Sequence, residues 1–185
     1  IGIGQGAGSS ITTGVENTII GGIAGDALTV GYQNVALGYQ ALTTGQGSSA
    51  NVAIGTAALA AANSGATSST TYNTAVGHLA GTAVATGYQN TLIGALSGDA
   101  LTVGIENVAL GVSSLGAAVA DARTTAIGYS ALASQVNPNF GSVVHTYNVA
   151  VGYTAGTNIT TGLQNTLVGG LAGDALTDAD YNVAI

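Results

Sequence analysis

The stretch Asn51-Val52-Ala53-Ile54-Gly55 returns, with conservative changes, along the whole chain. Most openings of this unit lie 17 residues apart; the exceptions are the steps from Asn51 to Asn73 and from Thr124 to Asn148, which are longer. A truncated unit precedes the first opening. The opening residues are Asn17, Asn34, Asn51, Asn73, Asn90, Asn107, Thr124, Asn148, Asn165 and Asn182. A fixed period of this length is the signature of a repeat protein in which each unit stacks on its neighbours.

Positions within the unit are counted here from the opening residue. Position 4 is always Ile, Leu or Val, and we predict that it forms an aliphatic core. Position 5 is always Gly, which we expect at a tight turn. The opening asparagines are expected to form an amide ladder along the axis. The predicted core residues are Ile20, Leu37, Ile54, Val76, Ile93, Leu110, Ile127, Val151 and Val168, and the predicted turn residues are Gly21, Gly38, Gly55, Gly77, Gly94, Gly111, Gly128, Gly152 and Gly169.

These columns predict an all-β fold, a parallel β-solenoid with about 17 residues per turn. A helix is disfavoured because each unit carries a fixed Gly and many β-branched residues. We expect one short strand over positions 1 to 4 and a second over positions 7 to 9, such as Gln40-Ala41-Leu42. About eleven turns, roughly 4.8 Å apart, make residues 1–185 one continuous repeat domain. Both ends fall inside a repeat, so we expect a segment of a longer fibre.

A longer period groups the units in fours. The sequence Gly-Asp-Ala-Leu-Thr recurs at 25–29, 98–102 and 173–177, and insertions near 60–72 and 133–147 fall at the same point of each group. Insertions on a rigid scaffold commonly carry recognition, so we expect protruding loops. Pro138, Phe140 and His145 form the candidate recognition loop. The alternative is that the insertions only pack against a neighbouring chain.

Composition predicts that the rod is stable mainly as an assembly. The chain is 46% apolar and 5% charged, and a 17-residue turn encloses only two or three aliphatic side chains. That burial is smaller than the entropy lost on ordering the turn. The small residues at position 8 (Ala or Ser), with the frequent Ala at position 3, predict a flat face that packs on other chains. A parallel homotrimer is the simplest closed arrangement.

The near-absence of cations restricts the possible partners. Arg123 is the only basic side chain other than histidine, and the net charge is −7. Nucleic-acid binding is therefore not expected, and no apolar stretch is long enough to insert in a membrane as a helix. Cysteine is absent, which excludes disulfides and thiol chemistry.

The candidate metal site is weak. Asp26, Asp99 and Asp174 lie in segments that nearly match a calcium-binding nonapeptide of β-rolls. Calcium needs six to eight oxygens, whereas each copy here is isolated by about four units. We favour turn-capping carboxylates and expect no cofactor, with calcium as the alternative.

Other candidate residues point to surface roles. Three tyrosines follow the conserved Gly at position 6 and are interpreted as an amphipathic rim, with sugar stacking as the alternative. His78 and His145 have no partners at catalytic spacing, and Asp178 and Asp180 occur in one unit only. Asn158-Ile159-Thr160 is a formal glycosylation acceptor. We therefore expect no catalytic residues and no enzyme.

The unit resembles known surface fibres. Asn51 to Gly55 and its relatives resemble the head repeat of trimeric autotransporter adhesins, and the segments 34–45 and 152–162 resemble repeats of phage tail fibres. The resemblance covers essentially the whole chain. It implies a left-handed parallel β-roll, with three chains in one shaft on a cell or virion surface. The unit is slightly longer than the adhesin repeat, and the adhesin neck motif and membrane anchor are absent, which favours a fibre shaft of the phage type.

Two functions therefore compete. The first is the structural shaft of an extracellular attachment appendage that binds a cell-surface glycan or protein through loops or an absent tip. The second is a self-assembling extracellular filament or matrix protein without a specific ligand. Periodic Thr would also suit an ice-binding protein, although pairs such as Thr43-Thr44 recur only in some units.

Overall fold

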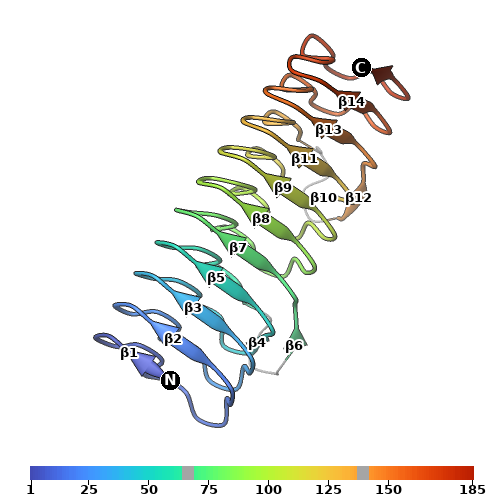
Figure 1. The fold of residues 1–185 in the computed structure, drawn as a ribbon. Helices are drawn as coiled ribbons and strands as arrows, with labels where there is room; N and C mark the ends of the chain where they lie inside the picture. Colours follow the sequence, from blue (N-terminus) through green and yellow to red (C-terminus); the bar gives the residue numbers. More distant parts are fainter. Residues whose placement is uncertain (64–68, 137–141) are drawn as a thin grey trace.

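The computed structural model describes residues 1–63, 69–136 and 142–185, and it is a β-solenoid (Figure 1). One parallel sheet of eleven short strands runs from the N-terminal to the C-terminal end. Each unit forms one turn of the coil, called a rung here and numbered from the N-terminus, so rung 2 begins at Asn17. No helix occurs in the described ranges. The predicted all-β parallel solenoid with about 17 residues per turn is confirmed.

The strands of the large sheet all lie between positions 2 and 4 of their units. They are β1 (Gly2–Ile3), β2 (Thr18–Ile20), β3 (Val35–Leu37), β5 (Val52–Ile54), β7 (Thr74–Val76), β8 (Thr91–Ile93), β9 (Val108–Leu110), β11 (Thr125–Ile127), β13 (Val149–Val151), β14 (Thr166–Val168) and β15 (Val183–Ala184). Each strand pairs in register with the equivalent residues of the next rung, as Val35 does with Val52.

Hydrogen bonds join the rungs outside the strands as well. The backbone N–H of Gly25 donates to the carbonyl of Ala41 at 2.9 Å, and that of Leu42 donates to Ala58 at 3.0 Å. Equivalent atoms of neighbouring rungs therefore stay one strand spacing apart around the coil, and eleven rungs give a rod on the order of 50 Å long.

The predicted core lies on the wrong side of the strand. Every one of the position-4 residues named above is at least partly exposed, and Leu110 reaches 45%. Position 3 points inward instead: Ala36, Leu92 and Ala109 are fully buried. Successive side chains of a strand face opposite sides, so position 3 and position 4 cannot both line the interior. The size of the position-4 side chains suggested burial, but the narrow coil accepts mostly Ala at the inward position.

Position 8 is also inside the coil, so the prediction that small residues there pack on other chains is wrong. Ala24, Ala58 and Ala131 are fully buried, and Ser97 and Ser114 are buried with their hydroxyl oxygens 3.2 Å apart. Ser97 also donates to the carbonyl of Ala109 at 3.0 Å. The small residues allow opposite walls of the coil to approach each other within one chain.

The second strand predicted over positions 7 to 9 is absent from the described rungs. Those residues form turns, and both position 7 and position 9 adopt left-handed backbone angles, as Gln40 (φ 58°) and Leu42 (φ 54°) do. A pair of left-handed residues two apart reverses the chain direction without a strand. Residues other than Gly adopt this conformation infrequently, so the residue types at positions 7 and 9 did not predict it.

The insertions add two small parallel sheets. Strand β6 (Ser69–Thr70) pairs with β4 (Ser48–Ser49), and β12 (Val144–His145) pairs with β10 (Asp121–Ala122). The described C-terminal part of each insertion thus lies on the preceding rung, where it extends the coil. The middle of each insertion falls outside the described residues.

Candidate interaction surfaces of the rod

The opening asparagines form a buried amide ladder. In the step from rung 2 to rung 3, Asn17 Oδ1 accepts hydrogen bonds from the Asn34 backbone N–H and from Asn34 Nδ2, both at 3.0 Å. Nδ2 also donates to a carbonyl 14 residues later in its own rung, as in the 2.8 Å bond from Asn34 to Ser48. Such an amide therefore joins two rungs and closes its own, whereas Asn51 and Asn182 donate instead to the carbonyls of Ser49 and Asp180. The same Nδ2-to-Oδ1 step joins Asn34 with Asn51, Asn73 with Asn90, Asn90 with Asn107, Asn148 with Asn165 and Asn165 with Asn182.

The side-chain ladder changes partners at both insertions. After the first insertion, the Thr71 hydroxyl donates to Asn51 Oδ1 at 2.7 Å, and the backbone N–H of Asn73 still donates to the same oxygen at 3.0 Å. In the rung that carries the second insertion, Thr124 stands in place of the asparagine, and its hydroxyl pairs with that of Thr146. The ladder thus has a break every four rungs, where an equivalent threonine enters the column.

Gln135 replaces the amide that Thr124 lacks. Its Oε1 accepts from Asn148 Nδ2 at 3.0 Å, and its Nε2 donates to Asp121 Oδ1 at 3.1 Å. Gln135 is almost fully buried, at a position where other rungs carry aliphatic or small residues. A buried polar group without a partner is costly, so this glutamine and the threonine substitution depend on each other.

The glycine at position 5 has two reasons to be invariant. Gly38 has φ of +141°, which side chains rarely tolerate, and an added Cβ would lie 2.5 Å from the carbonyl oxygen of Gly55. The other predicted turn glycines also have positive φ, from +128° at Gly55 to +145° at Gly152. The chain leaves the strand at this point, where it packs directly against the backbone of the next rung.

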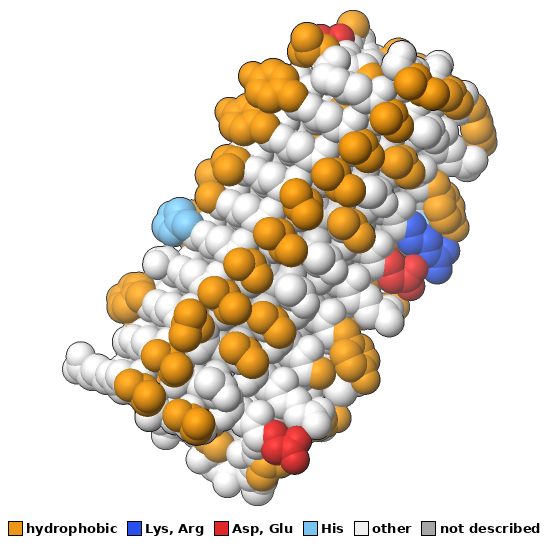
Figure 2. Space-filling model, in the orientation of Figure 1, with side chains coloured by type: hydrophobic (Ala, Val, Ile, Leu, Met, Phe, Trp, Pro, Cys, Tyr) orange, Lys and Arg blue, Asp and Glu red, His pale blue; other side chains and the backbone are white. Residues whose placement is uncertain are grey.

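The outward face of the large sheet is apolar along the rod. Position 2 holds Val or Thr in every rung after the first, where Ile1 stands, and position 4 holds Ile, Leu or Val in all eleven rungs. Figure 2 shows these hydrophobic side chains in rows along the sheet, with the charges seen in this view near its borders and ends. We call positions 2 and 4 together the apolar face. Contiguous apolar surface of this kind marks interaction sites in soluble proteins.

The three candidate calcium ligands are not brought together within the chain. Asp26, Asp99 and Asp174 occupy position 10 of rungs 2, 6 and 10, so about 19 Å separates successive copies. Among the described residues, no three His, Asp or Glu side chains gather as they would around a metal ion. Burial raises the pKa of the Asp99 carboxyl, and a hydrogen bond from its own backbone N–H offsets part of that rise.

One long edge of the rod carries aromatic and imidazole side chains at position 6. Tyr39, Tyr129 and Tyr153 are all more than half exposed, and the rings of Tyr129 and Tyr153 stack with centroids 5.4 Å apart. His78 is exposed in the same column. The stacked pair follows from the parallel register, which places equivalent side chains of neighbouring rungs face to face.

The remaining candidates are surface residues with local partners. His145 is exposed, and its ring lies 6.0 Å from that of Tyr147. Asp180 accepts from the Leu163 backbone N–H at 2.7 Å, and Asp178 accepts from Thr177 at 3.2 Å. The structure therefore places Asp178 and Asp180 in turn contacts.

The candidate recognition loop and the formal glycosylation acceptor are placed only in part. Pro138 and Phe140 lie outside the described residues, and the described ends of the insertions belong to the coil. In the acceptor sequence, Asn158 is exposed and its side chain donates to the carbonyl of Asp174 at 2.7 Å. This contact ties Asn158 to the next rung.

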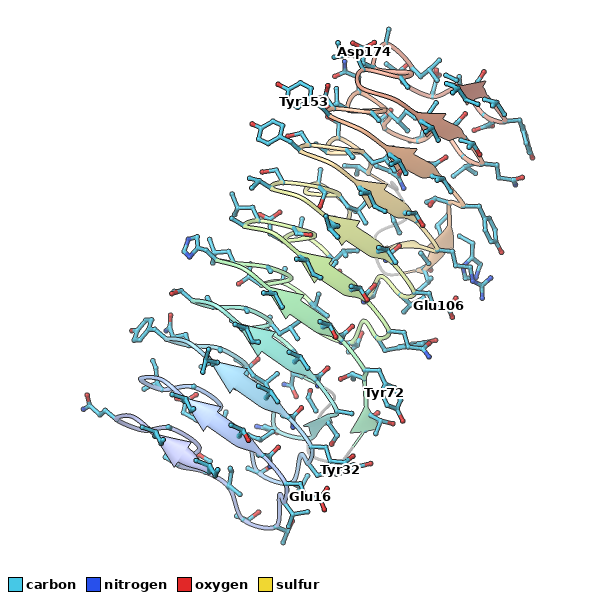
Figure 3. The ribbon with its side chains drawn as sticks, viewed as in Figure 1. Glu16, Tyr32, Tyr72, Glu106, Tyr153 and Asp174 are labelled. Carbon is cyan, nitrogen blue, oxygen red and sulfur yellow. The ribbon has the colours of Figure 1, made fainter. Side chains whose placement is uncertain are left out.

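The residue immediately before each opening residue, which is position 17 in a unit without an insertion and is called position 17 throughout, forms a second polar column that the sequence analysis missed. It is occupied by Glu16, Gln33, Ala50, Tyr72, Gln89, Glu106, Arg123, Tyr147, Gln164 and Tyr181. Figure 3 shows Glu16, Tyr72 and Glu106 along one edge of the rod and Tyr153 on the opposite edge. The signal was present in the repeat alignment, where long polar side chains recur immediately before each opening residue.

Comparisons with protein families, with curated proteins and with solved structures give no match for this chain. No helix among the described residues is long and apolar enough to span a membrane. The class that the fold defines is a parallel β-solenoid built from tandem repeats.

Proposed function

We propose that this chain is part of the structural shaft of a surface-exposed attachment fibre of the phage tail-fibre or adhesin type. In this proposal three parallel chains, each a left-handed coil, form the shaft, and the chain acts as a scaffold without catalytic activity. Its location is extracellular, on a cell or virion. Ligand binding through the insertion loops or an absent tip belongs to the same proposal.

The apolar face is the observation that carries this proposal. It contains no charged residue in any of the eleven rungs, and Leu37, Ile93, Leu110 and Val168 remain between 36% and 45% exposed. Soluble monomers rarely leave long apolar stretches in water. A second and third copy of the same face would cover it, because a parallel arrangement matches Val and Thr columns with Ile and Leu columns over the length of the rod.

The interior supports the same proposal from another direction. Many rungs enclose alanine at two of their inward positions, as Ala53 and Ala58 show in rung 4. Such an interior removes little apolar area from water for each 17 residues ordered. Association through the apolar face adds burial without lengthening the repeat.

The test is the mass of the native particle combined with a matched pair of variants. Leu110 and Val112 lie two residues apart and are 45% and 44% exposed, but only Leu110 belongs to the apolar face. We expect the wild type to have the mass of three chains, Leu110→Lys to fall to one chain, and Val112→Lys to keep three. Sedimentation equilibrium measures each mass.

Two results would reject this function. A wild-type monomer at micromolar concentration would leave the apolar face without its proposed partner. A mass that grows with concentration without limit would instead support the alternative, a self-assembling extracellular filament that binds no specific ligand.

A further inference from the structure

The position-17 column holds nine of the eighteen Glu, Arg, Gln and Tyr side chains of this chain. It contains both glutamates, the only arginine, three of the eight tyrosines and three of the glutamines, although it is one position in seventeen. Ala50 is the only small residue among its ten members. From Tyr72 to Tyr181 every member is aromatic or bears a hydrogen-bonding group. We call these ten residues the comb.

The backbone conformation does not select these residues. Every member of the comb has φ between 50° and 61°, a region that favours Gly and Asn over long side chains. Position 7 has the same left-handed conformation in rungs 2 to 10, yet it holds a mixture that includes Ile23, Ala57, Ser113 and Leu171. The preference at position 17 therefore concerns what the side chains do outside the coil.

The comb is exposed and held at a fixed spacing. Tyr72, Tyr147 and Tyr181 are 59%, 48% and 73% exposed. In rungs of 17 residues the backbone N–H of position 17 donates to the carbonyl of position 16 in the preceding rung, as in the 3.1 Å bond from Arg123 to Ile105. In the two rungs with insertions the residue before the tyrosine makes this bond, from Thr71 to Ser49 and from Thr146 to Ala122, both at 3.0 Å. Side chains thus project about every 4.8 Å along the edge, and no pocket opens among the described residues.

Some comb side chains in successive rungs contact one another. Gln33 Nε2 donates to Glu16 at 2.9 Å, Arg123 Nε donates to Glu106 at 2.7 Å, and Arg123 also donates to the Tyr147 hydroxyl at 2.8 Å. The guanidinium lies 5.8 Å from the centre of the Tyr147 ring. These contacts pre-order long side chains that would otherwise lose conformational freedom on binding.

We infer that the comb is a binding track for a linear, uncharged polysaccharide. Tyrosine rings stack on the apolar face of a sugar, while amide, carboxylate and guanidinium groups bond its hydroxyls. One residue of an extended sugar chain is about as long as the spacing between two rungs. Successive side chains of the comb can therefore contact successive sugar residues. The comb holds two carboxylates and one guanidinium, which disfavours an anionic polymer. This inference goes beyond the proposed function and does not depend on the number of chains in the shaft.

The experiment measures retention of the full chain on insoluble neutral polysaccharides, with cellulose, chitin and a β-mannan as probes and alginate beads as the anionic comparison. The test variant combines Tyr72→Ala, Tyr147→Ala and Tyr181→Ala. The matched control combines Tyr39→Ala, Tyr129→Ala and Tyr153→Ala on the opposite edge. A second test variant, Gln89→Ala with Gln164→Ala, removes hydrogen-bonding groups and leaves every ring in place.

We expect the wild type and the control to bind at least one neutral polymer and the triple test variant to bind at least about tenfold more weakly. The glutamine variant should bind with intermediate strength. Retention on none of the neutral polymers, stronger retention on alginate, or equal loss in test and control variants would overturn the inference. Native mass measured on each variant separates a binding defect from a failure of assembly.

Discussion

Rungs 6 and 7, residues 90–106 and 107–123, share one fold but fill it differently. Rung 6 has Leu92 at position 3, Gly98 at position 9 and Leu101 at position 12, whereas rung 7 has Ala109, Leu115 and Ala118 at these places. Two leucines in rung 6 thus give way in rung 7 to one leucine, which stands where rung 6 has glycine. The same exchange recurs along the rod: rungs 2 and 10 follow rung 6, and rungs 3, 4 and 8 place Leu at position 9. Leu at position 9 is always accompanied by Ala at position 3, and Gly at position 9 is always accompanied by Ile, Leu or Val at position 12.

Glycine at position 9 shows the physical reason for this pairing. A Cβ on Gly98 would lie 2.8 Å from Leu92 Cδ2 and 2.9 Å from Leu101 Cδ1. Leu115 of rung 7 has nearly the same backbone angle as Gly98, φ 53° against 55°. The glycine therefore makes room for neighbouring leucines, and the left-handed angle alone does not demand it.

The largest effect is expected from giving rung 6 the residues that rung 7 has at positions 3 and 9. Leu92→Ala should lower the free energy of unfolding by about 2–5 kcal/mol because it leaves a cavity. Gly98→Leu should lower it by about 1–3 kcal/mol through overpacking. The double variant should recover part of the loss, because the new leucine fills the space left by the old one. Urea titration of the four proteins measures the coupling. Strict additivity within about 0.5 kcal/mol would show that the two positions do not share a volume.

A smaller effect is expected at the amide ladder where it joins rungs 6 and 7. Asn90 Oδ1 accepts from the Asn107 backbone N–H at 3.1 Å and from Asn107 Nδ2 at 3.0 Å. Asn90→Ala leaves buried donors without an acceptor, and we expect a loss of about 2–4 kcal/mol. The exposed neighbour Gln89→Ala serves as the control and should change stability by less than about 0.5 kcal/mol. Equal denaturation midpoints for Asn90→Ala and wild type would contradict a stabilising ladder.

Asn90→Thr sharpens the same point, because threonine occurs naturally in the ladder at Thr124. That site has Gln135 as a replacement acceptor, and rung 6 has Leu101 at the equivalent position. Asn90→Thr should therefore remain destabilised. Thermal melts compare it with Asn90→Ala and wild type, and full stability in this variant would mean that the glutamine at rung 8 is not needed.

The smallest effect is expected at Asp99 of rung 6, whose carboxylate lies close to Gly116 of rung 7. A Cβ on Gly116 would lie 3.5 Å from the Asp99 carboxylate. Burial raises the pKa of Asp99 above its ordinary value of 3.8, so the folded state holds the proton more tightly than the unfolded state. Its contribution to stability is thus greatest below pH 3.8 and falls as pH rises through the folded-state pKa. Asp99→Asn should stabilise the protein by about 0.5 kcal/mol or less at pH 7.

The measurement is the midpoint of urea unfolding between pH 3 and pH 7 for wild type and Asp99→Asn. Asp174→Asn, at the same position of rung 10, serves as the matched control. The difference between Asp99→Asn and wild type should shrink as the pH falls. If the stability difference between Asp99→Asn and wild type grew as the pH fell, the pKa of Asp99 would not be raised by burial.

The repeat predicted the asparagine and glycine columns, but it did not predict which apolar residues face outward. The asparagine column and the glycine column were recognisable because each has one chemical type in almost every unit. The apolar face was misassigned as the core, since Leu37 and Leu110 are larger than the alanines beside them. A second clue, the exchange between Leu92 with Gly98 and Ala109 with Leu115, identifies the inward positions once it is compared across rungs.

The sequence by itself determined the 17-residue turn, the parallel register and the places where the register is interrupted, because stacked repeats must align equivalent residues. Only the tertiary structure decided which side of each strand faces inward and how the chain turns at positions 7 and 9. A strand of apolar residues has two apolar sides, and the choice between them depends on the volume enclosed when the coil closes. That volume is a property of the whole turn, and it leaves the outward side of Val108 and Leu110 free for a partner.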